Sequence, residues 1–289
     1  MADTWREADT RKEYIDSAVK AVALAEYKLK TLCTIDSSDA WTESYFQRTN
    51  TVEATGGGTY SGVSGVPQMA PFPFIQQTFT KVSSVILKYA AESVISLEAQ
   101  QTATVPMLSA HILTIGRTVA YSVDTAIEAV MDASFGNTVA VAAGYEWDSA
   151  TVANRDPIKN ILDAIQMIRA DDLNPLNGNG YLVVNGTDYT NIISNSKVIN
   201  NPTFKTADVV SNGVVGQLCG LKIMISEVID AEDAYVVIAK EGLTWKEADA
   251  LTVVTIEDPG KSTTIRAWER GVCQIPAPNA VCKLTNTRA

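Results

Sequence analysis

The chain has 289 residues, of which 46% are apolar and 19% charged, so it can bury a sizeable core in one or two domains. Its 33 acidic residues outnumber 23 basic ones and give a formal net charge of −10, which argues against a basic groove that tracks nucleic-acid phosphates. The polar N-terminus has no signal pattern and no stretch reaches the roughly 18 apolar residues that span a membrane, so we expect synthesis in the cytoplasm.

Residues 10–32 carry apolar side chains at helical spacing with charged residues between them, which predicts an amphipathic helix. The apolar positions are Ile15, Val19, Val22, Leu29 and Leu32. Two placements are open. The helix docks on its own domain, or it is an arm that lies on a neighbouring subunit.

From Trp41 to about Tyr89 the sequence is rich in β-branched and polar residues and has little helical periodicity. Two such runs flank the glycines Gly56, Gly57 and Gly58, which predicts a long hairpin with a flexible tip. A two-stranded ribbon this polar has too little apolar surface to be stable alone. We therefore expect it to contact another subunit.

Two helices are predicted next. The first covers residues 104–134, with Thr104 as its N-cap and Gly136 as its stop, and its length of roughly 30 residues exceeds the usual globular helix and suggests a spine. The second opens at Asp156-Pro157 and ends near Asp171.

The C-terminal half contains short apolar runs typical of strands. They cover residues 181–184, 221–225, 234–239 and 280–284. A short helix is predicted over 188–194, and residues 251–256 and 262–268 flank a turn at 257–261, which predicts a β-hairpin. Because strands and helices are interleaved without regular βαβ alternation, the fold class is predicted as α+β.

Catalytic and metal-binding chemistry is nearly absent from the sequence. His111 is the single histidine, which excludes metal sites built on several imidazoles, and we expect it to be structural. The fragment Pro259-Gly260-Lys261-Ser262 ends like a P-loop, but Thr255 replaces the first glycine and a strand-like run follows where the motif needs a helix. We predict no catalytic residue, no cofactor site and no metal site.

Four cysteines are scattered along the chain without a CxxC pair. They are Cys33, Cys219, Cys273 and Cys282. We expect them to be reduced and mostly packed, since free cysteine is among the most buried residue types. The alternative pairs Cys273 with Cys282 across neighbouring strands.

The order of the segments carries more information than any one of them. The C-terminal segments are Tyr181–Tyr189, Gly216–Ser226, Ala234–Gly242, the hairpin through Arg266 and Trp268, Arg270–Val272, and the ending Asn279–Thr285. In this order they resemble the major capsid proteins of tailed viruses with the Hong Kong 97 fold. The upstream arm, glycine-tipped hairpin and long helix resemble that family's N-arm, extended loop and spine helix.

The resemblance implies an α+β fold of the Hong Kong 97 type, with an arm, an extended loop and two domains. The implied division is an N-terminal arm at 1–36, an extended loop at 37–90, a peripheral domain at 91–140 and 248–289, and an axial domain at 141–247.

The implied function is self-assembly as hexamers and pentamers into the icosahedral head of a virion, which encloses double-stranded DNA without sequence-specific binding. Further implied partners are scaffold, portal and decoration proteins. No association with a membrane is implied. Gly56, Gly57, Gly58, Arg266 and Arg270 are predicted subunit contacts, from their loop positions and because arginine is favoured in interface ion pairs.

Two departures from known relatives limit these expectations. Some relatives join subunits by a Lys–Asn isopeptide bond from the extended loop, but no lysine occurs between Lys30 and Lys81, so we predict no covalent link by that route. Some carry a cleaved N-terminal scaffolding segment, whereas this chain begins with its arm, so we expect a separate scaffold or none.

Two other functions compete with the capsid interpretation. An encapsulin-like nanocompartment would use the same fold to package an enzyme, with residues 10–32 helping to bind a cargo peptide. A soluble enzyme would run as a monomer or small oligomer and not as a large particle.

Overall fold

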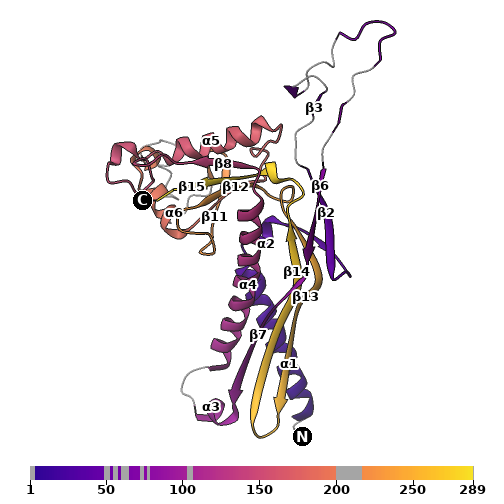
Figure 1. Cartoon of the computed structure of the whole chain (residues 1–289). Helices are drawn as coiled ribbons and strands as arrows, with labels where there is room; N and C mark the ends of the chain where they lie inside the picture. The colour runs from indigo at the N-terminus through magenta and orange to yellow at the C-terminus, as the bar shows by residue number, and fades with distance from the viewer. Residues whose placement is uncertain are drawn as a thin grey trace.

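The computed structural model describes residues 4–48, 53–54, 58–59, 65–71, 75–76, 79–102, 107–199 and 217–288. The molecule has an elongated lower part, a compact upper part and a narrow extension that carries β3 (Glu53–Ala54) and projects beyond both (Figure 1). Mixed helices and sheets confirm the predicted α+β class. None of the helices in the described ranges is both long and apolar enough to span a bilayer.

The N-terminal helix is broken where the sequence predicted one continuous helix. Helix α1 covers Thr4–Glu26 and helix α2 covers Leu29–Leu32. The break occurs because the Asp124 carboxylate accepts hydrogen bonds from the backbone N–H groups of Lys28, at 2.7 Å, and Lys30, at 3.1 Å, and so starts a new helix. Of the two predicted placements, docking on the chain's own domain is the one observed.

A four-stranded sheet forms the lower part of the molecule. Its order is β1 (Thr34–Ser37), β13 (Thr244–Asp258), β14 (Ser262–Gln274) and β7 (Leu87–Ser96). The predicted C-terminal hairpin is confirmed as β13 and β14, which extend further than expected. Ile265 and Ala267 of β14 pack with Ile15 and Val19 of α1 and with Ile115 of α4 (Met107–Ser134), so both helices cover one face of this sheet.

Helix α4, Met107–Ser134, is the predicted spine and runs between the two parts of the molecule (Figure 1). Its predicted N-cap, Thr104, lies outside the described residues. Its end is confirmed at Gly136, where a side chain would have its Cβ 2.6 Å from the backbone nitrogen of Asn279. The helix must therefore stop where the C-terminal chain crosses it.

The upper part is a six-stranded sheet between two helices. Its order is β10 (Gln217–Leu218), β11 (Leu221–Ile225), β9 (Gly180–Val184), β12 (Ala234–Ile238), β15 (Val281–Thr285) and β8 (Asn137–Ala140). One face packs on the end of α4 through Val183 and Val237. The other packs on α5, Pro157–Ala170, through Leu182 and Val236.

The remaining helices are short. They are α3 (Leu97–Thr102), α6 (Gly186–Ser194), α7 (Ser196–Ile199) and the 3-10 turns Val152–Asn154 and Pro278–Ala280. Helix α5 begins after Asp156, whose carboxylate accepts from the Lys159 backbone N–H, and ends before Asp171, as predicted. Helix α6 begins two residues earlier than predicted because Asn185 caps it at Thr187.

The predicted long hairpin is confirmed in its described parts. Strand β2 (Thr42–Arg48) pairs antiparallel with β6 (Phe79–Val85), and we call this pair the ribbon. Beyond it, β3 (Glu53–Ala54) pairs with β4 (Gly58–Thr59) and β5 (Ile75–Gln76). After Ile86 the chain changes partner and enters β7, so the second predicted run is two strands. The domain division stays a prediction.

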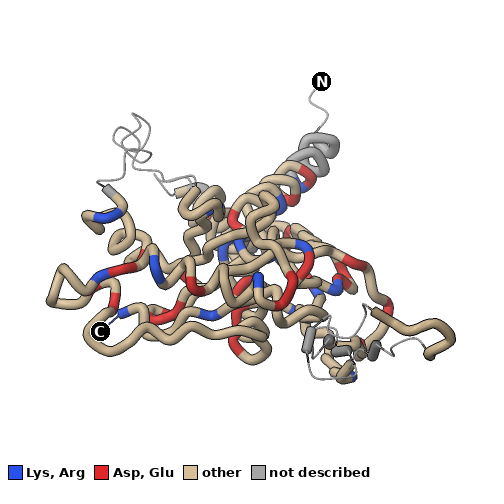
Figure 2. Tube along the Cα trace, turned by 90° about the horizontal axis from the view of Figure 1, so that it is seen from above, with Lys and Arg blue, Asp and Glu red and all other residues tan. Residues whose placement is uncertain are grey.

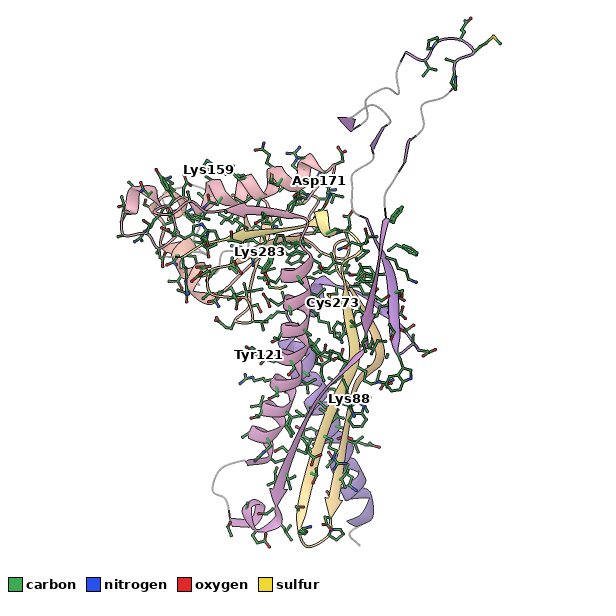
Figure 3. The ribbon with its side chains drawn as sticks, viewed as in Figure 1. Lys88, Tyr121, Lys159, Asp171, Cys273 and Lys283 are labelled. Carbon is green, nitrogen blue, oxygen red and sulfur yellow. The ribbon has the colours of Figure 1, made fainter. Side chains whose placement is uncertain are left out.

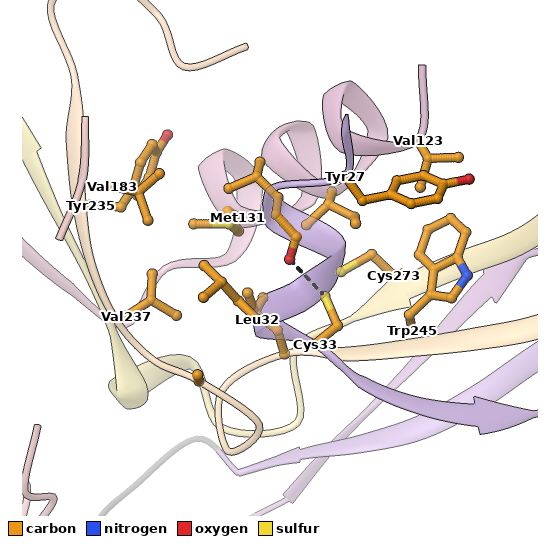
Figure 4. Close-up of a cluster of buried hydrophobic side chains, with 14 of the residues drawn as sticks. Tyr27, Leu32, Cys33, Val123, Met131, Val183, Tyr235, Val237, Trp245 and Cys273 are labelled. Carbon is orange, nitrogen blue, oxygen red and sulfur yellow. Dashed lines mark hydrogen bonds between the residues drawn. The ribbon is translucent and has the colours of Figure 1, made fainter. Parts of the chain in front are cut away.

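All four cysteines are free thiols, as expected. Cys273 lies in the core cluster beside α2 and α4, near Cys33 and Trp245 (Figure 4). Cys282 lies in the other cluster, on the α5 side of the upper sheet. The alternative pairing of Cys273 with Cys282 is therefore wrong, because the two side chains belong to different core clusters.

Candidate functional site

The ribbon exposes three large apolar side chains on one of its two sides, with the hydrogen-bonded pair Ser44 and Ser83 between Val85 and Phe46. Phe46 lies opposite Lys81 and Val85 lies opposite Thr42, so these residues share one side with Phe79. Phe46 is 64% exposed, Phe79 52% and Val85 59%. Large apolar side chains gathered on an exposed surface indicate a protein-interaction site.

The opposite side of the ribbon faces its own chain. Tyr45 and Val82, which lie opposite each other, are half-buried there. Burial raises the pKa of the Tyr45 hydroxyl, and a hydrogen bond with the Ile275 backbone partly opposes this shift. One side of the ribbon is thus fixed to the body while the other is left for a partner.

The outer face of the four-stranded sheet, away from α1 and α4, combines aromatic and charged side chains. Arg266 Nε lies 2.5 Å from Glu92 Oε2, and Arg270 Nε lies 2.6 Å from Asp249 Oδ2. The Arg270 guanidinium also lies over the Trp41 ring, 5.6 Å from its centroid. Both predicted arginines therefore lie on one surface, and each already has a carboxylate partner within the chain.

Of the predicted contact glycines, the structure describes Gly58, and it does not join this surface. Gly58 lies on β4, which pairs with β3, and Figure 1 shows β3 beyond the far end of the ribbon. Gly56 and Gly57 lie outside the described residues. The ribbon itself carries one lysine, Lys81, which lies opposite Phe46, and the sequence has no lysine between Lys30 and Lys81.

A buried charged group fixes α2 to the four-stranded sheet, and the sequence did not reveal it. Glu269 is fully buried and binds the Lys30 ammonium, which also lies 3.1 Å from Glu247 Oε1. The Tyr27 hydroxyl donates to Glu269 Oε2 at 2.6 Å and Trp245 Nε1 donates to Oε1 at 3.0 Å. This set, called the arm lock, attaches the N-terminal segment to β13 and β14.

One sequence signal could have pointed to the arm lock. Ile265, Ala267 and Glu269 alternate along β14, so Glu269 takes an inward position next to apolar inward residues. An inward carboxylate needs a charged partner. Its partner Lys30 is 239 residues away, so the sequence pattern gives no indication of which cation it is.

Asp124 also holds the arm, and its removal should weaken the fold. Replacing it with alanine leaves the buried N–H groups of Lys28 and Lys30 without acceptors, which should lower the free energy of unfolding by about 1–3 kcal/mol. Asp124→Asn retains one acceptor oxygen and should cost less. Denaturant unfolding of the two variants compares them, and equal losses would contradict the capping role.

The same carboxyl gives a pH dependence. Burial raises the pKa of Asp124, against the lowering effect of three backbone hydrogen bonds. The folded state therefore binds the proton more readily than the unfolded state. Relative to Asp124→Asn, the unaltered chain should lose stability as the pH rises from the ordinary aspartate pKa through the raised folded-state pKa, with no further change above it.

The residues considered for chemistry have structural surroundings. His111 Nδ1 lies 2.5 Å from the Ser93 hydroxyl, between α4 and β7. The P-loop-like fragment forms the turn between β13 and β14, where Gly260 has a φ of 77°, so it does not precede a helix. Among the described side chains, no group of three or more His, Cys, Asp or Glu is arranged to hold a metal ion.

Comparison with known proteins decides the family. The family described as phage capsid protein matches residues 80–284, which is more than half of the chain. The chain belongs to this family. The capsid subunit therefore has a structural role in a shell, as expected from the order of its segments.

Solved structures show the same fold at low sequence identity. The capsid of cyanophage P-SCSP1u matches with a TM-score of 0.64 and 13% identity over 90% of this chain and 88% of that chain. Mycobacterium phage Che8 matches with 0.63 and 16% over 91% and 93%. A virus-like particle from Pyrococcus furiosus matches with 0.62 and 11% over 95% and 99%.

These neighbours confirm the expected Hong Kong 97-type fold. No curated protein matches the sequence. The family match favours a phage capsid subunit over an encapsulin-like shell.

Proposed function

We propose that the capsid subunit assembles with copies of itself, as hexamers and pentamers, into a closed icosahedral head that encloses double-stranded DNA, and that its role is structural and not enzymatic. The observation that carries this proposal is the exposed apolar face of the ribbon. Assembly takes place in the host cytoplasm and the product is the virion. Scaffold, portal and decoration proteins are further partners in this proposal.

The ribbon supports the proposal because its exposed apolar side chains are not covered by any other part of the described chain. Phe46, Phe79 and Val85 stay in contact with water unless a second molecule covers them. Burying a large apolar side chain stabilises a contact by about 1.5–3 kcal/mol. Repeated over every subunit of a closed shell, modest contacts of this kind give a cooperative assembly.

The charge distribution supports enclosure of DNA without tight binding. Lysines and arginines alternate with acidic residues along the described trace (Figure 2), and the whole chain has a net charge of −10. Because phosphate affinity comes from neutralising many phosphates with clustered cations, this surface suits a container that later releases its genome.

Subunit contacts at Gly56, Gly57, Gly58, Arg266 and Arg270 are part of the proposal. The glycines belong to the far end of the extended loop, which would reach a neighbouring subunit. Arg266 is exposed, so it can exchange its Glu92 partner for a carboxylate on a neighbour. Arg270 is more enclosed and contributes through Trp41.

The proposal is tested by expressing the chain alone, separating it by size and imaging the largest fraction by negative-stain electron microscopy. Closed shells or capsomer rings are expected. DNA inside particles from infected cells supports the viral head, whereas an enzyme inside would support the encapsulin-like alternative. A stable monomer that a scaffold protein does not bring into particles would contradict the proposal.

Deleting residues 56–65 should leave a folded subunit that does not assemble. The core clusters are formed by other parts of the chain, so the loss of this segment should not change the unfolding transition. Size-exclusion chromatography and circular dichroism measure the two properties. Normal shells from the deleted chain would refute a role of the loop tip in assembly.

A further inference from the structure

Strand β7 forms a long free edge of the four-stranded sheet. It pairs with β14 over ten residues in unbroken register, from Leu87 opposite Gly271 to Ser96 opposite Ser262. No strand of the described ranges pairs with its other side. The opposite edge, β1, has four residues. Natural proteins usually protect an edge with short strands, bulges, proline or charged side chains. Strand β7 is long, pairs without a bulge and has no proline, and its charged residues are Lys88 and Glu92.

The outward side chains of β7 carry opposite charges two positions either side of Ala90. Lys88 and Glu92 lie on the outer face of the sheet with Ala90 between them. Glu92 is opposite Arg266 and is ion-paired with it. Lys88 is opposite Arg270, a like charge, and lies 5.3 Å from the centroid of the Trp268 ring (Figure 3).

Lys88 therefore has an aromatic contact with Trp268 but lacks an oppositely charged partner of the kind that Glu92 has in Arg266. Among the described residues, no carboxylate lies within ion-pair distance of its ammonium group. Like charges directly opposite in a sheet are destabilising. A carboxylate on the free side of β7 would relieve this repulsion.

We propose that β7 pairs antiparallel with β7 of a second copy about a two-fold axis at Ala90, so that Lys88 of each copy faces Glu92 of the other. This inference rests on the proposed shell function and names the contact between two of its subunits. The pairing joins two four-stranded sheets into one of eight strands. The interface is isologous, as a two-fold axis requires.

The register follows from the charges. Residues directly opposite each other in an antiparallel pair point to the same face. The residue at the two-fold axis must therefore lie opposite its own copy, because an axis between two successive residues would set side chains of different faces opposite each other. An axis at Lys88 or Glu92 sets like charges together, and an axis at Tyr89 or Ala91 leaves both charges unpaired. Only the axis at Ala90 pairs both charges, and it places two small side chains opposite each other.

Disulfide trapping tests this register. In the pair, the two copies of Ala90 have Cα atoms about 4.5–5.5 Å apart, within the disulfide range of about 4.4–6.8 Å. Assembled A90C particles, oxidised gently and run on a denaturing gel without reductant, should give a dimer band that reductant removes. The native cysteines provide the background, measured with unaltered particles.

V94C is the matched control. Val94 lies on the same face of the same strand and is 55% exposed. In the proposed register its two copies lie about 27 Å apart, from eight residues at about 3.4 Å each, so V94C should give no dimer. Normal particles without an A90C dimer, or with equal dimer from both variants, would overturn the inference while leaving the shell function intact.

A charge swap provides the second test. K88E sets glutamates opposite Glu92 across the axis but places a favourable charge opposite Arg270 within the chain, so the subunit should fold normally while particle yield falls at least ten-fold. K88E/E92K restores both cross-copy pairs and should recover most of the yield. An unchanged particle yield from K88E would overturn the pairing. So would a double variant that gives no more particles than K88E although its subunit unfolds at the same temperature as the unaltered subunit.

Discussion

Replacing Lys30 with methionine should lower the free energy of unfolding by about 3–5 kcal/mol, because Glu269 would keep a buried charge without its cation. The Glu269 side chain has no exposed surface and the Lys30 side chain is 8% exposed. The hydrogen bonds from Tyr27 and Trp245 would remain, but they donate to a carboxylate whose charge is no longer balanced.

The surroundings of the arm lock make this loss hard to relieve. Burial and the nearby Glu269 carboxylate raise the pKa of the Tyr27 hydroxyl well above its usual value, so Tyr27 stays a donor and supplies no charge. The Lys30 ammonium also lies 4.8 Å from the centroid of the Tyr27 ring, a contact that methionine does not reproduce. The Glu269 side chain has no exposed surface in the folded subunit, so solvent does not replace the missing cation.

The measurement is denaturant unfolding of unassembled subunits, with two controls. K159M removes an ion pair with Asp163 on the exposed side of α5, and it should have no measurable effect. K30M/E269Q removes both charges and should recover much of the loss. A loss from K30M as small as that from K159M would show that the arm lock does not stabilise the subunit.

The sequence predicted most periodic elements but not the contacts that join them. The spine helix and α5 were found because apolar residues recur every three or four positions and because Asp156 and Gly136 mark ends by local chemistry. The break between α1 and α2 was missed because its cause, Asp124, lies 96 residues from Lys28. The chain pairs with β2 before Ile86 and with β14 after it. This change was missed because β6 and β7 are both sequences typical of strands, without a turn signal between them.

The sequence placed Arg266 and Arg270 on one hairpin but did not identify the residues beside them. Arg266 and Arg270 were placed on the correct hairpin, but their carboxylate partners Glu92 and Asp249 come from other positions that only the sheet register brings close. The apolar ribbon face was hidden because Phe46 and Phe79 are 33 positions apart and share a side only through strand pairing. Recognition of the family depended on segment order, which does not name contacts.

Replacing both Phe46 and Phe79 with serine should abolish assembly and leave the subunit folded. The two rings are 64% and 52% exposed and belong to no core cluster, so their loss removes little from the folded state of one chain. Covering each ring in a subunit contact contributes about 1.5–3 kcal/mol, and the loss applies to every subunit of the shell.

The control is Tyr121→Ser, which removes a similarly exposed ring, 58%, from helix α4 and not from the ribbon. Electron microscopy counts particles and thermal unfolding reports the subunit. Particles from Y121S and none from F46S/F79S, with equal unfolding temperatures, would assign assembly to the ribbon face. Particles from F46S/F79S in normal yield would mean that another surface holds the shell together, and the free β7 edge would then be the first to consider, because its contacts do not involve either ring.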